Sequence, residues 1–320
     1  MPFLSVVTAC YNEEENVEEN VRQVRAVMES LPSRALPDGG CEPYTYEHLF
    51  IDNASGDRTV EILRGVCAQD RRVKVIVNTR NFGHIRSPFH GLLTAGGDAV
   101  ISIVADMQDP PEMIRDFVTK WEAGYKVVVG VKKESLEKKS MFFVRNMFYR
   151  LIDSLSEVPL VRHFTGFGLY DRVVMDKLRE IDDPYPYFRG LICDLGYERA
   201  EIPYSQPARR HGVTKNNFYS LYDMAMLGIT NHSKVPLRLA AMAGFALSIV
   251  ALVVAVAYLV LKLALWNTFS LGLAPLVIGV YLLGSVQLFF IGILGEYIGS
   301  IHTQVHHRPL VIERERINFD

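Results

Sequence analysis

Short apolar runs alternate with amphipathic stretches along the first two thirds of the chain. Each run has strand length and is rich in β-branched residues, and most are followed by a polar turn and then by apolar residues at helical spacing. The pattern predicts strands at 4–9, 46–51, 73–77, 100–105, 126–131, 164–171 and 199–203. It predicts helices at 17–28, 60–69, 85–94, 111–122 and 186–195. This alternation predicts an α/β fold with a mostly parallel sheet covered on both faces.

One strand end concentrates candidate chemistry. The apolar run at 101–105 ends in Asp106, and Gln108, Asp109 and two prolines follow. Proline stops the strand and suits the first turn of a helix. Open α/β sheets bind ligands at the carboxyl ends of their strands, and oxygen donors there suit a hard cation such as Mg²⁺ or Mn²⁺. The alternative is a polar turn in which Asp109 only caps the next helix.

Polar residues also follow the first two strands. Tyr11, Asn12 and Glu13 follow the first, and Asp52 ends the second. A carboxylate at such a strand end can accept a hydrogen bond from a ribose hydroxyl or a base N–H. No G-x-G-x-x-G follows the first strand, and no G-x-x-x-x-G-K-[ST] occurs in the chain. A dinucleotide-binding oxidoreductase and a P-loop NTPase are therefore disfavoured.

A basic loop with a glycine lies at 207–215. Its Arg209 and Lys215 can clamp a phosphate, with the arginine binding in bidentate fashion. The alternative is ordinary positive charge beside a membrane that attracts anionic lipid. The net charge is −2, and the chain has no basic tract, so a nucleic-acid partner is not expected.

The C-terminal third of the 320 residues is strongly apolar. Between Leu239 and Gly295 the only charged residue is Lys262. The two apolar stretches, 235–265 and 271–298, are each long enough to cross a hydrocarbon core of about 30 Å. They predict two transmembrane helices, and no signal peptide is recognised at the start of the chain.

Basic residues flank both spans on one side and are absent from the connecting loop at 266–270. Both termini are therefore expected on the cytoplasmic side, with 301–320 as a short cytoplasmic tail. An amphipathic stretch at 216–234 is expected to lie on the bilayer surface. Four cysteines without paired spacing are expected to be free thiols.

Two further segments leave alternatives open. The aromatic-rich stretch 142–152 is expected to be core, with a membrane-facing helix as the alternative. Glycines in the second apolar stretch allow close helix packing and a homo-oligomer, or reflect ordinary glycine usage in membrane helices. These are Gly272, Gly279, Gly284, Gly292, Gly295 and Gly299.

Five motifs in order, at 11–14, 52–59, 81–84, 106–112 and 209–215, precede the two apolar stretches. This arrangement resembles the family 2 inverting glycosyltransferases that charge a polyprenyl phosphate with a sugar. It looks closest to the bactoprenol glucosyltransferases, and the dolichyl-phosphate mannose synthases are more distant. The resemblance implies a GT-A domain over 1–215, a nucleotide-diphosphate sugar donor and a divalent metal, Mg²⁺ or Mn²⁺.

The resemblance also implies roles for single residues. Asp106 and Gln108 would hold the metal on the donor diphosphate. Arg209 and Lys215 would grip the lipid phosphate and, with Asp106, form the catalytic set. The expected donor-binding residues are Tyr11, Asn12, Glu13, Asp52, Asn53, Gly83 and Asp106.

Three positions depart from the family pattern. Val104 stands where many relatives have a first aspartate, Gly166-Phe167-Gly168 where some have Gly-Asp-Phe-Arg, and Asn53 where a second aspartate is common. A lipid phosphate has a second pKa near about 6, is mostly dianionic at neutral pH and needs no general base. The departures therefore argue against a sugar hydroxyl as acceptor and are compatible with a phosphate.

The predicted reaction is inverting transfer of a hexose to undecaprenyl phosphate, with UDP-glucose as the first choice of donor and GDP-mannose as the second. The alternative from another class is a non-catalytic, membrane-anchored scaffold with a degenerate donor site. A processive polysaccharide synthase is disfavoured, because two spans with so short a loop cannot easily form a translocation channel.

Overall fold

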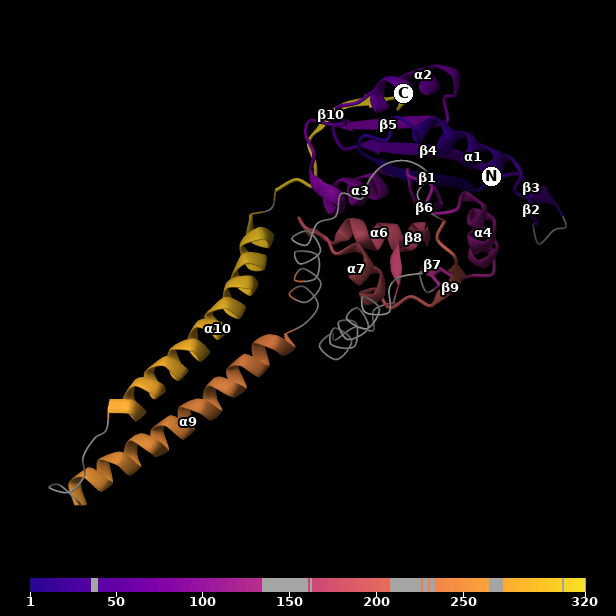
Figure 1. The fold of residues 1–320 in the computed structure, drawn as a ribbon. Coiled ribbons are helices and arrows are strands. Elements are labelled where there is room, and N and C mark those ends of the chain that lie inside the picture. Colours follow the sequence, from indigo (N-terminus) through magenta and orange to yellow (C-terminus); the bar gives the residue numbers. More distant parts are fainter. Residues whose placement is uncertain are drawn as a thin grey trace.

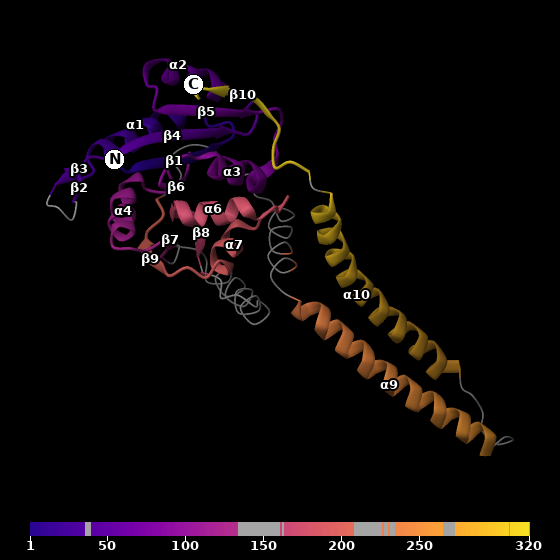
Figure 2. The same ribbon diagram turned by 180° about the vertical axis from the view of Figure 1, so that it is seen from behind.

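The computed structural model describes residues 1–35, 40–133, 161, 163–207, 226, 230, 234–264, 273–306 and 308–319. These residues form one α/β domain, from which two long helices extend side by side (Figures 1 and 2). The predicted fold class is confirmed, and every strand predicted from the apolar runs is present within a few residues of its expected bounds.

The domain is built on an eight-stranded sheet in the order β10-β5-β4-β1-β6-β8-β7-β9. Strands β1, β4, β5, β6, β7 and β9 run in one direction, and β8 and β10 run the opposite way. The strands are β1 Phe3–Cys10, β4 Thr45–Asp52, β5 Val73–Asn78, β6 Ala99–Val104, β7 Val127–Lys132, β8 Phe164–Asp171, β9 Arg199–Tyr204 and β10 Glu313–Ile317. A separate two-stranded sheet, β2 Arg34–Ala35 and β3 Cys41–Glu42, precedes β4 and was not predicted.

Helices cover both faces of the sheet, because side chains alternate between faces along each strand. On β1, Val6 packs with the helices of one face and Val7 with those of the other. The first face carries α1 Val17–Glu29, α2 Thr59–Gln69 and α4 Ile114–Glu122, which follows a 3₁₀ turn at Pro111–Met113. The second carries α3 Gly83–Thr94, α6 Arg172–Glu180 and α7 Phe188–Asp194.

The sequence analysis missed α6. Its nine residues are mostly polar, and only Val174, Met175 and Leu178 are buried. Asp171 caps its first turn by accepting a hydrogen bond from the Val173 N–H at 3.0 Å. The helix begins directly after β8, so no turn residues separate the two elements in the sequence.

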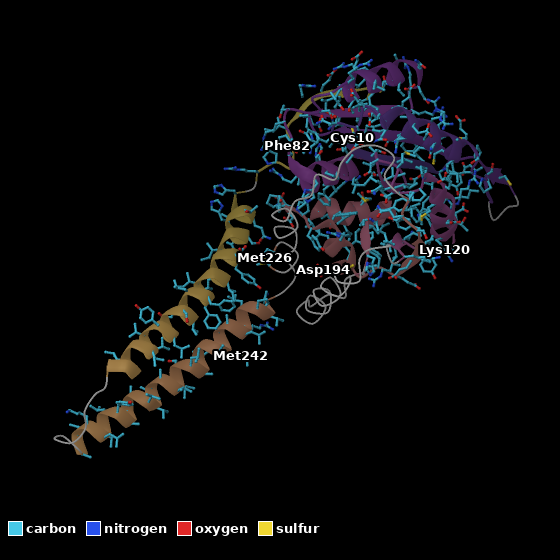
Figure 3. All side chains as sticks on the ribbon, in the orientation of Figure 1. Cys10, Phe82, Lys120, Asp194, Met226 and Met242 are labelled. Carbon is cyan, nitrogen blue, oxygen red and sulfur yellow. The ribbon has the colours of Figure 1, made fainter. Side chains whose placement is uncertain are left out.

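The two extended helices are α9 Val235–Ala264 and α10 Leu273–Val305. Both are long and apolar enough to cross a membrane, as predicted. Their side chains, Met242 among them, project outward along the whole length of each helix (Figure 3). Helix α10 continues beyond the predicted end of the second apolar stretch at residue 298.

The prediction of a tail at 301–320 does not include a strand that the structure has there. After α10 the chain returns to the domain, where β10 pairs antiparallel with β5 at the edge of the sheet. The reason for the miss is the sequence of β10, in which charged residues predominate and which resembles a solvated tail. The first strand of the chain and the last therefore belong to the same sheet.

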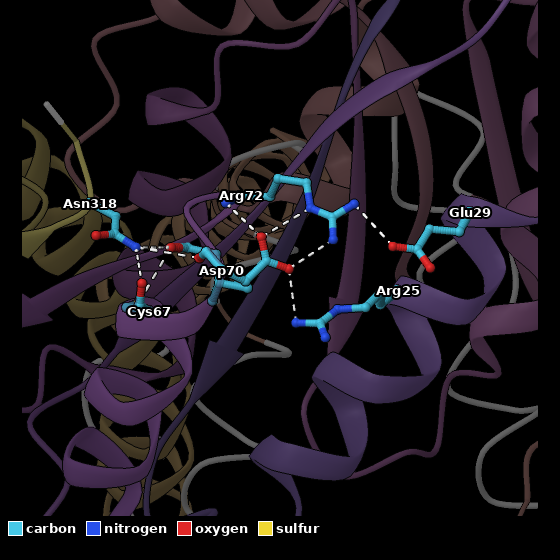
Figure 4. Close-up of polar contacts among 7 residues, drawn as sticks. Arg25, Glu29, Cys67, Asp70, Arg72 and Asn318 are labelled. Carbon is cyan, nitrogen blue, oxygen red and sulfur yellow. Dashed lines mark hydrogen bonds and ion pairs between the residues drawn. The ribbon is translucent and has the colours of Figure 1, made fainter.

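Asn318 anchors the end of this returning segment (Figure 4). Its side-chain amide donates to the carbonyl oxygens of Cys67 at 2.8 Å and Val73 at 3.0 Å. Its φ of 62° lies in the left-handed region, which asparagine and glycine tolerate best. Nearby, Asp70 accepts hydrogen bonds from Arg72 and lies 2.8 Å from Arg25.

We expect Asn318→Ala to lower the free energy of unfolding by about 2 kcal/mol, through lost hydrogen bonds and backbone strain. Asn318→Gly should cost only about 1 kcal/mol, because glycine adopts the same φ without strain. Denaturant unfolding of the purified full chain in detergent measures both values. Equal stability of the alanine variant and the unchanged protein would show that this amide does not anchor β10.

A buried histidine joins the two central strands. His48 on β4 is 1% exposed, and its Nε2 lies 2.9 Å from the Thr8 hydroxyl oxygen on β1. Burial of the ring lowers the pKa of His48 to about 3. The neutral ring is thus the form that the fold accepts.

Because its folded pKa is depressed, His48 stabilises the domain fully above its unfolded pKa of about 6.5, and this contribution is lost as the pH falls toward 3. Because the unfolded chain takes up a proton at His48 and the folded chain does not, we expect the unfolding free energy to fall by about 2 kcal/mol between pH 7 and pH 5. His48→Gln, which cannot take up a proton, should flatten the dependence by that amount. Parallel pH profiles for the two proteins would contradict the assignment.

Candidate active site at the carboxyl edge of the sheet

The common direction of six strands gathers their carboxyl ends at one edge of the sheet. Two loops there, after β1 and β4, are bonded to each other. The Asn12 N–H donates to the Ser55 hydroxyl oxygen at 2.8 Å, and the Gly56 N–H donates to Asn12 Oδ1 at 2.7 Å. The Glu13 N–H donates to the Thr59 hydroxyl oxygen at 2.9 Å. The two loops therefore form one wall, in which Asn12 is exposed.

Tyr11 and Glu13 are half-buried in this wall. Asp52, at the end of β4, has an exposed fraction of 0%. Its carboxylate accepts from the Ser55 N–H at 3.0 Å and from the Ser55 hydroxyl. Burial raises the pKa of Asp52, and the contacts with Ser55 oppose that rise. Asp52 thus shapes the loop, and its expected contact with a nucleobase or ribose stays a prediction.

Asn53 links the β4 loop to the start of α3. Its Nδ2 donates to Asn81 Oδ1 at 2.9 Å and to the Gly83 carbonyl oxygen at 3.1 Å. Its Oδ1 accepts from the Phe82 N–H at 2.8 Å and from Asn78 Nδ2 at 3.3 Å. Gly83 has a φ of 87°, so the turn favours glycine. Asn53 therefore acts as a positioning residue for the loop at 81–83.

The end of β6 presents Asp106 and Gln108. Asp106 is 7% exposed, and its Oδ1 accepts from the Gln108 N–H at 3.2 Å. Between them, Met107 takes a positive φ of 61°. Helix α1 braces this turn, because Asn20 Nδ2 donates to the Val104 carbonyl oxygen at 3.2 Å. The Val104 side chain is 40% exposed, so a position that commonly holds an acid carries an apolar surface here.

Asp109 does not cap the next helix, so the alternative reading of this turn is wrong. The 3₁₀ turn that follows has no side-chain cap, and Tyr204 donates its hydroxyl proton to Asp109 Oδ1 at 3.0 Å. Burial raises the pKa of Asp109 to about 6, and Asp106 adds to the rise, whereas Tyr204 and Lys132 oppose it. The sequence analysis missed the partnership with Tyr204, because β9 lies nearly a hundred residues away.

The oxygen ligands after β6 suit a cation whose other ligands come from a substrate and from water. Within the described residues, no group of three or more His, Cys, Asp or Glu side chains could hold a metal ion. Asp106 and Gln108 offer one carboxylate and one amide oxygen. Mg²⁺ is commonly bound through one or two carboxylates, with substrate phosphates and water completing the shell. The residues present therefore fit a divalent cation that arrives with a diphosphate.

Phe167 explains why no acid faces the site from β8. Its side chain is 2% exposed and packs edge-on against Phe117 and Tyr204, with ring centroids 4.8 Å and 5.3 Å apart. A Cβ at Gly130 would lie 2.7 Å from the Phe167 ring, so the neighbouring strand leaves room for this ring. The Phe167 side chain belongs to the core, and the rings packed around it leave no room there for a carboxylate with its hydrogen-bond partners.

Several predicted features lie outside the described residues. These are Arg209 and Lys215, the stretch 142–152, most of the surface segment 216–234, and the loop 266–270. Their expected roles stay predictions.

Comparisons with known proteins follow the same direction. The model of glycosyl transferase family 2 matches residues 5–179. The uncharacterized glycosyltransferase YkcC of Bacillus subtilis is 34% identical over 99% of this chain and 94% of its own length. A bactoprenol glucosyl transferase of Shigella phage SfV is 30% identical over 98% of this chain and 99% of its own. A solved glucosyl-3-phosphoglycerate synthase from Mycobacterium tuberculosis, in complex with Mn²⁺, UDP and glucosyl-3-phosphoglycerate, has a TM-score of 0.45 and 17% identity, covering 72% of this chain and 78% of that chain.

Asn53→Asp places the acid that is common in relatives, yet we expect it to damage this site. The new carboxylate oxygen would face Asn81 Oδ1 and the Gly83 carbonyl without a proton to donate. We expect a loss of about 2 kcal/mol in unfolding free energy and a rise of about tenfold in the Kd for UDP, measured by calorimetry. Asn53→Ala, which adds no charge, should lose less in both. An aspartate variant that binds UDP as well as the unchanged protein would refute the positioning role.

Proposed function

Because the chain belongs to glycosyl transferase family 2, we propose that this glycosyltransferase moves a hexose from a nucleotide-diphosphate sugar to a polyprenyl phosphate, with inversion at the anomeric carbon. UDP-glucose and undecaprenyl phosphate are the proposed substrates. The observation that carries the proposal is the turn at Asp106 and Gln108, which stands at the same sheet edge as the wall built by Asn12 and Ser55. Relatives named bactoprenol glucosyl transferase align over nearly the full chain, including its apolar helices.

The donor is proposed to lie along the carboxyl edge. Tyr11, Asn12 and Glu13 would contact the nucleoside from the loop after β1, and Gly83 would contact it from the start of α3. Asp52 and Asn53 hold those loops in place through the contacts already described. This arrangement leaves the diphosphate over the end of β6, where Asp106 lies.

Asp106 and Gln108 are proposed to hold Mg²⁺ or Mn²⁺ against the donor diphosphate. When bound, such a cation neutralises the charge that develops on the leaving diphosphate. Asp106 is fixed for this role by its hydrogen bond from the Gln108 N–H and by burial of its side chain.

A lipid phosphate is proposed as the nucleophile, since it is mostly dianionic at neutral pH and needs no general base. The burial of Phe167 agrees with this, because no acid is offered from β8. Arg209 and Lys215 are proposed to grip that phosphate and to align it with the anomeric carbon. Supporting evidence is the position of β9, which ends at Tyr204 on the active edge shortly before Arg209 in the sequence.

The two apolar helices are proposed to span the membrane, with the catalytic domain and both termini cytoplasmic and the segment 216–234 lying on the bilayer. The placement of β1 and β10 in one sheet supports an even number of crossings. A homo-oligomer that packs through the glycines of α10 is proposed with this arrangement. GDP-mannose remains the alternative donor, and a non-catalytic scaffold the alternative function, for which Val104 is the motivating observation.

The test is hexose transfer by the purified full chain in detergent, with undecaprenyl phosphate, Mg²⁺ or Mn²⁺, and either radiolabelled UDP-glucose or GDP-mannose. We expect lipid-linked label from UDP-glucose, and its loss on addition of EDTA. Asp106→Asn should lower turnover at least about 100-fold, because it removes the charge that holds the cation. Asp116→Asn, an exposed acid on α4, should leave turnover unchanged.

The outcomes separate the alternatives. Label from GDP-mannose alone would replace the proposed donor. Nucleotide binding without lipid-linked label from either donor would favour the scaffold. Full turnover by Asp106→Asn would overturn the proposed metal site.

A further inference from the structure

A basic pocket is lined by residues of α3 and of the end of α10. Figures 1 and 2 show that α10 ends near α3 of the α/β domain. The pocket has a volume of about 310 Å³. Its basic lining consists of Arg86 on α3, His302 and His306 at the end of α10, and Arg308 just beyond that helix. Tyr185 completes one wall and is shared with an adjoining hollow.

The charge in this pocket is one-sided. None of the described residues that line it is an aspartate or a glutamate. Burial lowers the pKa of Arg86, and the positive charges of Arg80 and Arg308 lower it further. The nearby acids Asp183 and Glu296 line the adjoining hollow instead, and Glu313 is paired with His90 at 2.6 Å. An anion would relieve this repulsion.

Arg86 has donor capacity left over. One terminal nitrogen donates to the Pro309 carbonyl oxygen, which ties α3 to the returning chain. Its Nε is buried and has no hydrogen-bond partner within the described part of the chain. The Arg86 side chain also lines the pocket, and arginine is the side chain that binds phosphate oxygens most strongly.

A metal ion is a poor occupant of the same pocket. His302 and His306 are one helical turn apart, and their Nε2 atoms lie 3.1 Å from each other. That spacing alone is compatible with two metal ligands. However, the described residues supply no third His, Cys, Asp or Glu ligand. Two arginines in the lining would also repel a cation.

The position along α10 indicates where the anion comes from. His302 and His306 follow the apolar part of the helix and are exposed, as is Arg308. If α10 spans the membrane, these side chains lie at the depth of the lipid headgroups, where basic residues attract anionic lipids. The adjoining hollow, of about 420 Å³, follows α10 back toward its apolar part through Gly299, Gly295 and Gly292.

We propose that Arg86, His302, His306 and Arg308 bind the phosphate group of a membrane lipid. This inference rests on the membrane anchoring in the proposed function, but not on the transfer reaction. Arg86 is one turn along α3 from Gly83, so the bound phosphate would also hold the helix whose first residue borders the donor site. The site would fix the active edge of the domain against the bilayer.

The test measures lipid binding to the full chain in detergent by native mass spectrometry, with phosphatidylglycerol as the probe and phosphatidylcholine as the neutral comparison. We expect Arg308→Gln to raise the apparent Kd for phosphatidylglycerol about tenfold, and combined His302→Gln and His306→Gln to raise it further. Arg308→Lys should retain most of the binding. Lys177→Gln, an exposed basic residue on α6 that pairs with Glu180, is the matched control and should bind normally.

Two further probes identify the source of the phosphate. If undecaprenyl phosphate shows the larger loss on Arg308→Gln, the pocket serves the acceptor lipid; if phosphatidylglycerol does, it serves the bulk bilayer. Either result supports the site. Binding that is unchanged in Arg308→Gln and in the double histidine variant, or inorganic phosphate binding as tightly as either lipid, would overturn it. Because binding is read without hexose transfer, failure of the transfer assay leaves this result interpretable.

Discussion

The common direction of β1, β4, β5, β6, β7 and β9 is the constraint on which the rest of the molecule depends. It brings polar strand ends that are far apart in the sequence to one edge, with Asp52, Val104 and Tyr204 among them. Loops at such an edge need fixing, because their backbone groups have no ladder to join. The chain fixes them with side-chain amides, and Asn53 alone joins the end of β4 to the start of α3.

Val104 and Phe167 leave the ends of β6 and β8 at this edge without a further acid, which agrees with what the site is proposed to handle. Two phosphate groups approaching each other repel, and each further carboxylate would add to that repulsion. The chain holds Asp106 through the Gln108 N–H, keeps Asp109 bonded to Tyr204, and has the buried ring of Phe167 on β8. A hydroxyl acceptor would need a base among these groups, whereas a lipid phosphate does not.

Local patterns predicted most of the fold and part of the site. Apolar strands and amphipathic helices can be recognised within a few residues, and so can the position of Asp106 and Gln108 directly after a strand, whereas their role stays a prediction. The features that were missed depend on contacts across the chain. The partner of Asp109 comes from β9, the role of Asn53 depends on a loop after β5, and β10 carries alternating charges that gave no apolar signal. Pairing with β5 stabilises β10, and that contact cannot be read from the few residues around β10 in the sequence.

The placement of β10 also changes how the apolar helices relate to the catalytic domain. If α9 and α10 span the membrane as proposed, a tail that ended free would leave the domain tethered to it at a single point, before α9. Pairing of β10 with β5, reinforced by Asn318, adds a second tether after α10. Two tethers restrict rotation of the domain far more than one, and the second passes directly beside Arg86 and Arg308. A lipid phosphate bound there would therefore contact a segment that the proposed spans already hold close to the membrane. Most of the entropy lost in orienting the active edge would then be lost once, on folding, and not in each catalytic cycle.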